Sequence, residues 1–104
     1  MSSTPVIAVL GAGSWGTALA ILLTRNGARV RLWSHLQAQV ERIRQDGENN
    51  EFLPGIALPE NVRVTADLTM ALRQVDEVLV VVPSHAFRQV VEAVGRSTPP
   101  DAPL

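Results

Sequence analysis

The chain has 104 residues, 46% of them hydrophobic, and a formal net charge of −1. This length allows one domain at most, and the balanced charge gives no electrostatic reason to expect binding to nucleic acid or a membrane surface. The chain has no cysteine, which excludes disulfides and thiolate metal sites, and we predict no metal site of any kind. No apolar run approaches the roughly 18 residues of a membrane span, and residues 1–5 are too few and too polar for a signal peptide. We therefore expect a cytoplasmic protein.

A glycine-rich segment follows the first predicted strand. Residues 5–10 are apolar and rich in β-branched side chains, as in a buried parallel strand. Gly11, Gly13 and Gly16 come next with the spacing G-x-G-x-x-G, and a run of good helix formers follows them. In this motif the first glycine allows a sharp turn, the second lets a pyrophosphate approach the backbone, and the third lets the helix pack closely on the strand.

The position of this motif between a strand and a helix predicts dinucleotide binding. The bound anion would lie on free N–H groups at the positive end of the helix. The spacing by itself is a weak signal, but here it lies near the N-terminus in the strand–turn–helix context that the fingerprint requires. The alternative is a βα turn with a purely structural role.

The remaining predicted elements alternate between strands and helices. Strands are predicted at 29–33, 62–65 and 77–82, and helices at 15–26, 36–45, 67–75 and 84–95. Asn26-Gly27 is expected to end the first helix, and Asp67 and Ser84 are the expected N-caps of the last two. Residues 46–61 are expected to be irregular and residues 97–103 to be a connector. Strands separated by helices form right-handed βαβ units. We therefore predict an α/β, Rossmann-type doubly wound parallel sheet with the strand order 3-2-1-4.

This predicted sheet is unfinished, because the sequence stops where a fifth strand would begin. We expect residues 1–104 to be the N-terminal part of a dinucleotide-binding domain. One edge of the sheet would be exposed or paired with another copy of the chain, which leaves a homo-oligomer open.

The end of the second predicted strand bears on the choice of dinucleotide. Sites that prefer NAD place an Asp or Glu about 20 residues beyond the glycines, where it binds the ribose 2′-OH. Here that place holds Ser34 and His35, with Arg29 and Arg31 on the strand behind them. Because no carboxylate is there to repel a 2′-phosphate and His35 can donate to it, we expect NADPH, with NAD as the alternative. If His35 only begins a loop, then Arg29, Arg31 or Ser34 would set the choice.

Several segments together are more specific than the glycine motif. They are GAGSWGTALA at 11–20, VRLWSH at 30–35, NNEFLPG at 49–55 with LPENV at 58–62, and VVVPSH at 80–85. In this order, over residues 5–95, they resemble the N-terminal, cofactor-binding part of bacterial-type NAD(P)-dependent glycerol-3-phosphate dehydrogenases.

This resemblance implies an oxidoreductase that interconverts glycerol 3-phosphate and dihydroxyacetone phosphate by hydride transfer, supplying the phospholipid backbone. It implies that Ser14, Trp15 and His35 contact NADPH and that Phe87 lies against the cofactor. Pro83 is added because it follows the carboxyl end of a strand, where open α/β sheets bind ligands. The candidate cofactor-binding residues are therefore Gly11, Gly13, Ser14, Trp15, Gly16, Ser34, His35, Pro83 and Phe87.

The sequence departs from the family in what it lacks. The family's first catalytic lysine, in a Thr-Lys-Gly segment, would lie just beyond Leu104, and the second lysine and the substrate phosphate site would lie further on, in a helical domain. The chain contains no lysine, and its 9 basic residues are all arginine. No catalytic residue is therefore assigned, and we expect the 104-residue chain alone to be inactive.

Other interpretations remain open at this stage. Residues 49–59 are either a loop beside the active-site cleft, as in the family, or a surface excursion with Phe52 and Leu53 as core plugs. His85 is not favoured as a general acid or base, because it has no partner acid nearby in the sequence. For the whole chain, the alternatives are a non-catalytic Rossmann nucleotide-sensing domain and another two-domain dehydrogenase, such as a ketopantoate reductase-like enzyme. The latter would not be expected to combine the Phe-Leu-Pro-Gly and Pro-Ser-His segments.

Overall fold

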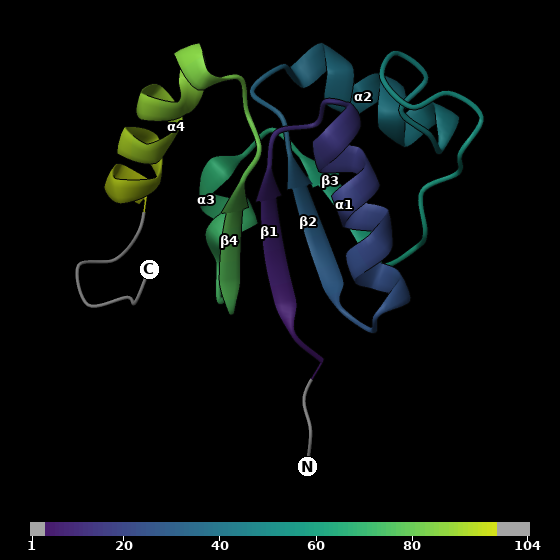
Figure 1. Ribbon diagram of the computed structural model, residues 1–104, viewed down its shortest axis with the longest axis horizontal. Helices are drawn as coiled ribbons and strands as arrows, with labels where there is room; N and C mark the ends of the chain where they lie inside the picture. Colours follow the sequence, from purple (N-terminus) through teal and green to yellow (C-terminus); the bar gives the residue numbers. More distant parts are fainter. Residues whose placement is uncertain (1–3, 98–104) are drawn as a thin grey trace.

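The computed structural model describes residues 4–97 as a single parallel sheet between two layers of helices (Figure 1). The elements in chain order are β1 (Val6–Leu10), α1 (Ser14–Arg25), β2 (Arg29–Trp33), α2 (Gln37–Asp46), β3 (Val62–Thr65), α3 (Leu68–Leu72), β4 (Glu77–Val80) and α4 (Ser84–Ser97). The strands are all parallel in the order β3-β2-β1-β4, which confirms the predicted 3-2-1-4 topology. The predicted connector beyond Ser97 lies outside the described residues.

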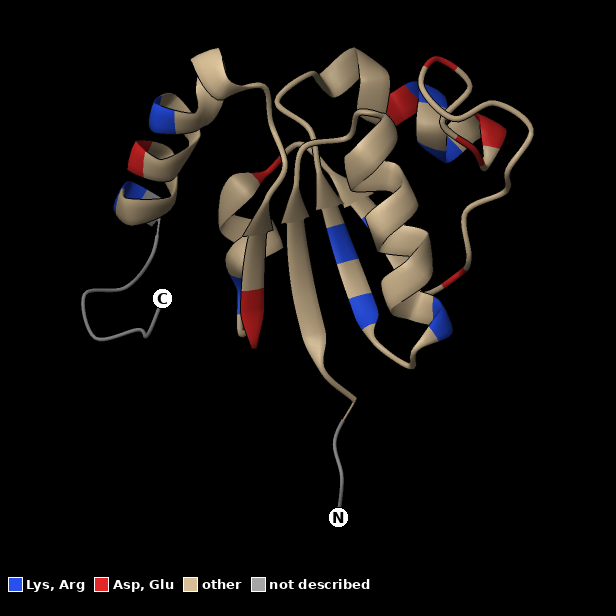
Figure 2. Cartoon of the chain, viewed as in Figure 1, with Lys and Arg blue, Asp and Glu red and all other residues tan. Residues whose placement is uncertain are grey.

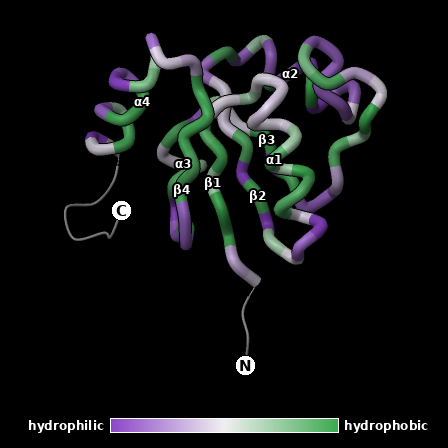
Figure 3. Tube along the Cα trace, in the orientation of Figure 1, coloured by the Kyte–Doolittle hydropathy of each residue, from purple (hydrophilic) through white to green (hydrophobic). Residues whose placement is uncertain are grey.

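Alternate side chains of the central strand face the two helix layers. Ile7 and Val9 pack with residues of α1 and α2 on one face, whereas Ala8 and Leu10 pack with residues of α3 and α4 on the other. The strands are accordingly hydrophobic along most of their length, as Figure 3 shows. Burial on both faces explains why the first strand is a continuous apolar run, without alternation of polar residues.

The termini of the helices follow local chemistry. Gly27 has a φ of 94° just after α1, as expected for the αL residue that ends a helix. The Asp67 side chain accepts a hydrogen bond from the Met70 N–H at 3.2 Å and so caps α3, as predicted. Ser84, in contrast, is the first residue of α4, so its predicted place as the N-cap is wrong by one residue.

Two other predicted boundaries are also wrong. The third helix ends at Leu72 instead of residue 75, because Arg73 is extended and Gln74 has a φ of 53°. The fourth strand ends at Val80 instead of residue 82, although Val81 still donates a hydrogen bond to the Leu10 carbonyl at 2.8 Å. Among residues 4–97, no helix is long and apolar enough to cross a membrane.

Candidate functional site

The turn between β1 and α1 contains three glycines, and the fold requires two of them. Gly11 has a φ of 130°, and a Cβ built there would lie 2.0 Å from the carbonyl oxygen of Val81. A Cβ on Gly16 would lie 1.7 Å from the carbonyl oxygen of Gly11. Both positions therefore need a residue without a side chain. This confirms the sharp turn predicted at Gly11 and the close helix–strand packing predicted at Gly16.

Gly13 is different, because nothing among the described residues requires a glycine there. Its φ of −81° and ψ of −166° are open to any residue, and a Cβ built on it would have no atom within 4 Å. Gly13 is the N-cap of α1, with no side-chain hydrogen bond to the first turn and no acidic residue in it. The N–H groups of the first three residues of α1 donate no hydrogen bond within residues 4–97, and they lie at the positive end of the helix, an arrangement that suits an anion.

This turn forms one wall of a cleft of about 440 Å³. The cleft lies where β1 and β2 end, at the edge of the sheet where open α/β folds bind ligands. Its walls are mainly apolar and come from five segments of the chain. The apolar residues that line it include Leu36, Phe52, Val81, Val82, Pro83, Ala86 and Val90. Figure 2 shows no charged residue on the glycine turn itself. An apolar cleft beside free N–H groups can hold a molecule that joins flat rings to a pyrophosphate.

A buried polar network holds the turn from beneath. The carbonyl oxygen of Ala12 accepts hydrogen bonds from Asn49 Nδ2 at 2.8 Å and from Gln39 Nε2 at 2.9 Å. Asn49 Nδ2 also donates to the Thr17 hydroxyl at 2.9 Å, and the Ser34 hydroxyl donates to Gln39 Oε1 at 2.5 Å. All four side chains are buried. The network therefore fixes the backbone on which an anion would rest.

Sequence reasoning missed Asn49 and Gln39 as parts of the site. Gln39 carried a signal, because it lies four residues before the buried Ile43 and thus on the inner face of α2. Asn49 carried almost none, since it lies in an irregular segment where polar residues are ordinary.

The structure brings part of the predicted set together in the cleft. The predicted residues that line it are Gly11, Gly13, Ser34, His35 and Pro83. The predicted residues that do not line it are Ser14, Trp15, Gly16 and Phe87. Trp15 and Phe87 are 77% and 50% exposed, so their contact with a cofactor stays a prediction. The Ser14 hydroxyl donates to the Phe52 carbonyl at 2.8 Å, which ties the first turn of α1 to the long loop.

The two residues at the end of β2 differ in their availability to a ligand. Ser34 is only 3% exposed, and its hydroxyl is used twice, as a donor to Gln39 and as an acceptor from the Leu36 N–H at 3.1 Å. His35 is exposed, with its ring centroid 6.3 Å from that of Trp33. His35 is therefore the residue of this pair whose side chain is free to meet a ribose or its phosphate.

Two expectations about charge near the cleft are corrected. Arg29 and Arg31 do not line it, because they point to another cleft near the start of β2. A carboxylate is present, since Glu51 of the long loop lines the cleft. Glu51 Oε1 forms an ion pair with Arg42 Nη2 at 2.9 Å. Sequence spacing from the glycines could not have found Glu51, because a loop and not β2 brings it there.

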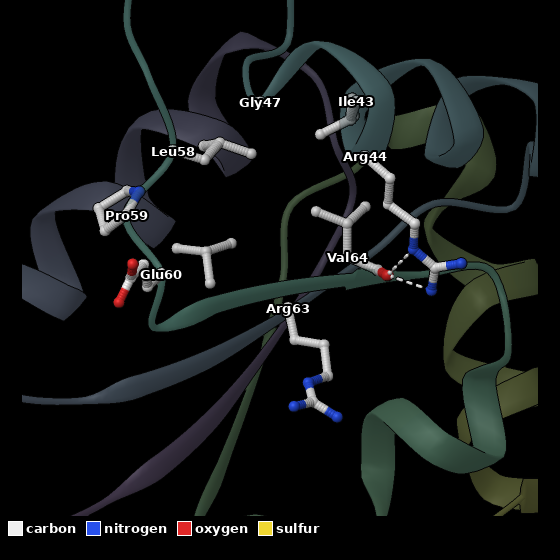
Figure 4. Close-up of a pocket in the computed structure, with 9 residues that line it drawn as sticks. Ile43, Arg44, Gly47, Leu58, Pro59, Glu60, Arg63 and Val64 are labelled. Atoms are coloured by element: carbon white, nitrogen blue, oxygen red, sulfur yellow. Dashed lines mark hydrogen bonds between the residues drawn. The ribbon is translucent and has the colours of Figure 1, made fainter.

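The long loop between α2 and β3 is beside the cleft. Phe52 lines the cleft and is 42% exposed, so the alternative in which it fills the core is wrong. Leu53 is half-buried. A separate hollow of about 270 Å³ lies on the other side of this loop, along β3 (Figure 4). There Arg44 donates to the Val64 carbonyl from Nε at 3.0 Å and from Nη2 at 2.6 Å. This contact covers a carbonyl group of an edge strand, which is a structural role.

Comparison with known proteins identifies the family. The family described as NAD-dependent glycerol-3-phosphate dehydrogenase N-terminus matches residues 6–104. The chain belongs to this family. It is 55% identical over 87 residues to an NAD(P)+ glycerol-3-phosphate dehydrogenase of Desulfotalea psychrophila, an alignment that covers 84% of the chain and 26% of the relative. A relative of the same name from Xanthomonas oryzae is 50% identical over 97 residues, which are 93% of the chain and 28% of that protein.

A solved structure supports the same assignment. The crystal structure of glycerol-3-phosphate dehydrogenase from Coxiella burnetii superposes with a TM-score of 0.88 at 43% identity, over 92% of the chain and 30% of that structure. The chain thus spans between a quarter and a third of the length of these relatives.

Proposed function

We propose that this chain binds a nicotinamide dinucleotide in the cleft beside the glycine turn, as the cofactor-binding part of a glycerol-3-phosphate dehydrogenase. The observation that carries the proposal is Gly13. Its backbone angles and its surroundings would accept a side chain, so the fold gives no reason for a glycine. A pyrophosphate that must reach the backbone gives one, because a Cβ would stand in its way.

The residues of the cleft fit such a cofactor. The N–H groups at the start of α1 would hold the pyrophosphate, and His35 would meet the adenosine ribose. The apolar walls, among them Val82 and Pro83, would exclude water from the bound rings. When bound, the nicotinamide supplies or accepts the hydride. The contribution of this chain is to bind and orient the cofactor.

We infer a preference for NADPH over NADH. Support comes from His35, which is exposed at the end of β2 where NAD-specific sites carry an acid. Glu51 does not argue strongly against this, because its charge is paired with Arg42. Both side chains are exposed, so solvent and salt also screen the charge of Glu51, which would weaken the preference without reversing it.

The substrate assignment rests on the family. Its relatives are named glycerol-3-phosphate dehydrogenases, and we propose the interconversion of glycerol 3-phosphate and dihydroxyacetone phosphate as the reaction to which this chain contributes. The domain assignment follows the same reasoning: residues 1–104 would be the front part of a dinucleotide-binding domain, with substrate and proton transfer handled by residues outside it. The cytoplasmic location and any homo-oligomer stay predictions.

Calorimetric titration with NADPH and NADH tests the binding proposal. We expect NADPH to bind more tightly than NADH, and Gly13→Val to abolish the signal while the far-UV dichroism stays unchanged. Undetectable binding of either dinucleotide to a folded chain would refute the proposal. Reduction of dihydroxyacetone phosphate by the natural full-length protein distinguishes the enzyme from a nucleotide-sensing domain, which would bind NADPH without turnover.

A further inference from the structure

A second cleft, of about 620 Å³, lies toward the amino ends of the strands, away from the glycine turn. Four arginines line it, namely Arg29, Arg31, Arg63 and Arg73, and we call this group the arginine cleft. Its other lining residues are Val6, Val30, Glu60, Asn61 and Met70. Arg31 pairs with Ala8 in the register of the sheet, three residues before Gly11, which is roughly 10 Å along a strand. The arginine cleft is therefore separate from the candidate dinucleotide site.

The register of the sheet places like charges together. Arg31 of β2 lies directly opposite Arg63 of β3. Side chains alternate along a strand, so Arg29 lies on the same face of the sheet as Arg31. Directly opposed like charges on neighbouring strands destabilise a sheet. The blue bands on β2 in Figure 2 mark Arg29 and Arg31 on an otherwise uncharged strand.

Arg31 is held in a fixed position by α3. Its Nη1 donates to the carbonyl of Met70 at 2.9 Å and to that of Arg73. Met70 lies in the last turn of α3 and Arg73 is its C-cap, so the guanidinium also lies at the negative end of this helix. Burial lowers the pKa of Arg31 below its usual value, and the charges of Arg63 and Arg73 lower it further.

The guanidinium groups of the other three arginines form no hydrogen bond or ion pair within residues 4–97. The ion pair formed in this part of the chain joins Arg42 to Glu51, elsewhere in the molecule. Figure 4 shows the Arg63 guanidinium on the opposite side of β3 from Leu58 and Ile43. This guanidinium forms no hydrogen bond or ion pair with Glu60. The nearby Asp76 carboxylate accepts a hydrogen bond from the Val6 N–H at 2.7 Å and does not line the arginine cleft. One carboxylate, Glu60, thus faces four guanidinium groups.

We propose that the arginine cleft binds a small anion that carries a phosphate group. A planar guanidinium group can donate two parallel hydrogen bonds to the oxygens of a phosphate. The exposed side chains of Arg29, Arg63 and Arg73 each carry such a group. A bound phosphate would relieve the repulsion across β2 and β3 beyond what Glu60 and the carbonyls at the end of α3 offset. The size of the arginine cleft suits a phosphate ester or a diphosphate as well as the free ion.

The test uses inorganic phosphate and pyrophosphate as probes with the protein at its natural full length. Binding is measured by calorimetry, and the unfolding midpoint is measured in phosphate and in chloride at equal ionic strength. The variants are Arg63→Gln and Arg73→Gln, with Arg88→Gln as the matched control, because Arg88 is exposed on α4 outside both clefts.

We expect phosphate to raise the unfolding midpoint of the unsubstituted protein more than chloride does. Arg63→Gln should raise the midpoint in dilute chloride, since it removes the repulsion, and should weaken phosphate binding at least tenfold. Arg88→Gln should leave both quantities unchanged. If Arg63→Gln fails to fold, Arg73→Gln, at the exposed end of α3, should show the same loss of binding.

Two results would overturn the proposal. Equal midpoints in chloride and phosphate would mean that the arginines are only screened by salt. A phosphate effect of the same size in the unsubstituted protein and in both cleft variants would place the anion elsewhere, for example at the glycine turn. Neither result would bear on whether the chain binds NADPH.

Discussion

Substitution of the glycines in the turn between β1 and α1 should separate ligand binding from folding. Gly13→Val adds a side chain where the chain has no atom within 4 Å and where the backbone is already extended. Because Gly13 is an N-cap without a side-chain hydrogen bond, the loss of stability should be at most about 1 kcal/mol. Loss of even one hydrogen bond between a backbone N–H and a charged phosphate costs roughly 1.5–3 kcal/mol, which is about tenfold to 100-fold in affinity.

Gly16→Ala should give the opposite pattern. Its Cβ would lie 1.7 Å from the carbonyl oxygen of Gly11, so the helix or the turn must move. Overpacking of this kind costs about 1–3 kcal/mol or more, a large share of the roughly 5–15 kcal/mol that stabilises a typical domain. Gly95→Ala on α4 is the matched control, because its Cβ would meet no atom of residues 4–97 within 4 Å. It should leave binding unchanged and stabilise the helix by roughly 0.5–1 kcal/mol.

The assay combines calorimetric titration with NADPH and the thermal midpoint by far-UV dichroism. We expect Gly13→Val to lose binding at a nearly unchanged midpoint, and Gly16→Ala to lower the midpoint by several degrees. If Gly13→Val binds NADPH as tightly as the unsubstituted chain, the turn does not receive a pyrophosphate. If Gly13→Val lowers the midpoint as much as Gly16→Ala, the fold itself needs Gly13, and Gly13 no longer supports the binding of a pyrophosphate.

Two further predictions concern the cleft, and a third concerns the chain as a whole. His35→Asp in the full-length enzyme should move the ratio of NADPH to NADH affinity toward NADH by about one to two orders of magnitude, because a carboxylate there repels a 2′-phosphate and accepts from a ribose 2′-OH; an unchanged ratio would show that His35 does not face the 2′ position. Asn49→Asp should weaken NADPH binding through loss of the donor to the Ala12 carbonyl, while its exposed neighbour Asn50→Asp should not; equal affinities in the two variants would show that the network does not position the turn. The 104-residue chain alone should not reduce dihydroxyacetone phosphate, because it contains no lysine, and measurable turnover by the pure chain would contradict this.

The topology was predictable because it depends on features that are local in the sequence. The apolar runs separated by helix-forming segments determine βαβ units, and the handedness of such units limits the strand order to few solutions. The boundaries failed where tertiary contacts decide them. The third helix stops at Leu72 with the Arg31 guanidinium on its last carbonyls, a contact that comes from a strand about 40 residues earlier.

Much of the candidate site was predictable, because the glycine spacing marks the turn and the ends of strands mark Ser34, His35 and Pro83, which line the cleft. The fold needs the absence of a side chain at Gly11 and Gly16, and we propose that a ligand needs it at Gly13; the spacing of the three glycines is visible in the sequence. That Arg29 and Arg31 line the arginine cleft, and not the cleft beside the glycine turn, was not predictable from their positions on β2. Arg31 belongs to the face that carries Trp33, but its cleft is set by β3 and α3, which follow later in the chain.

The irregular loop between α2 and β3 is as much a part of the site as the glycine turn. Three side-chain hydrogen bonds join the loop to the turn and to the start of α1: Asn49 donates to the Ala12 carbonyl at 2.8 Å and to the Thr17 hydroxyl at 2.9 Å, and Ser14 donates to the Phe52 carbonyl at 2.8 Å. The contacts of Asn49 are buried and that of Ser14 is exposed, so loss of an Asn49 contact costs more stability. Because the buried amide holds the carbonyl between Gly11 and Gly13, any shift of the loop would also reorient the N–H groups at the start of α1. These hydrogen bonds therefore hold the long loop against the glycine turn, and the loop in turn fixes the turn. This arrangement explains why Phe52 lines the cleft although 42% of it is exposed.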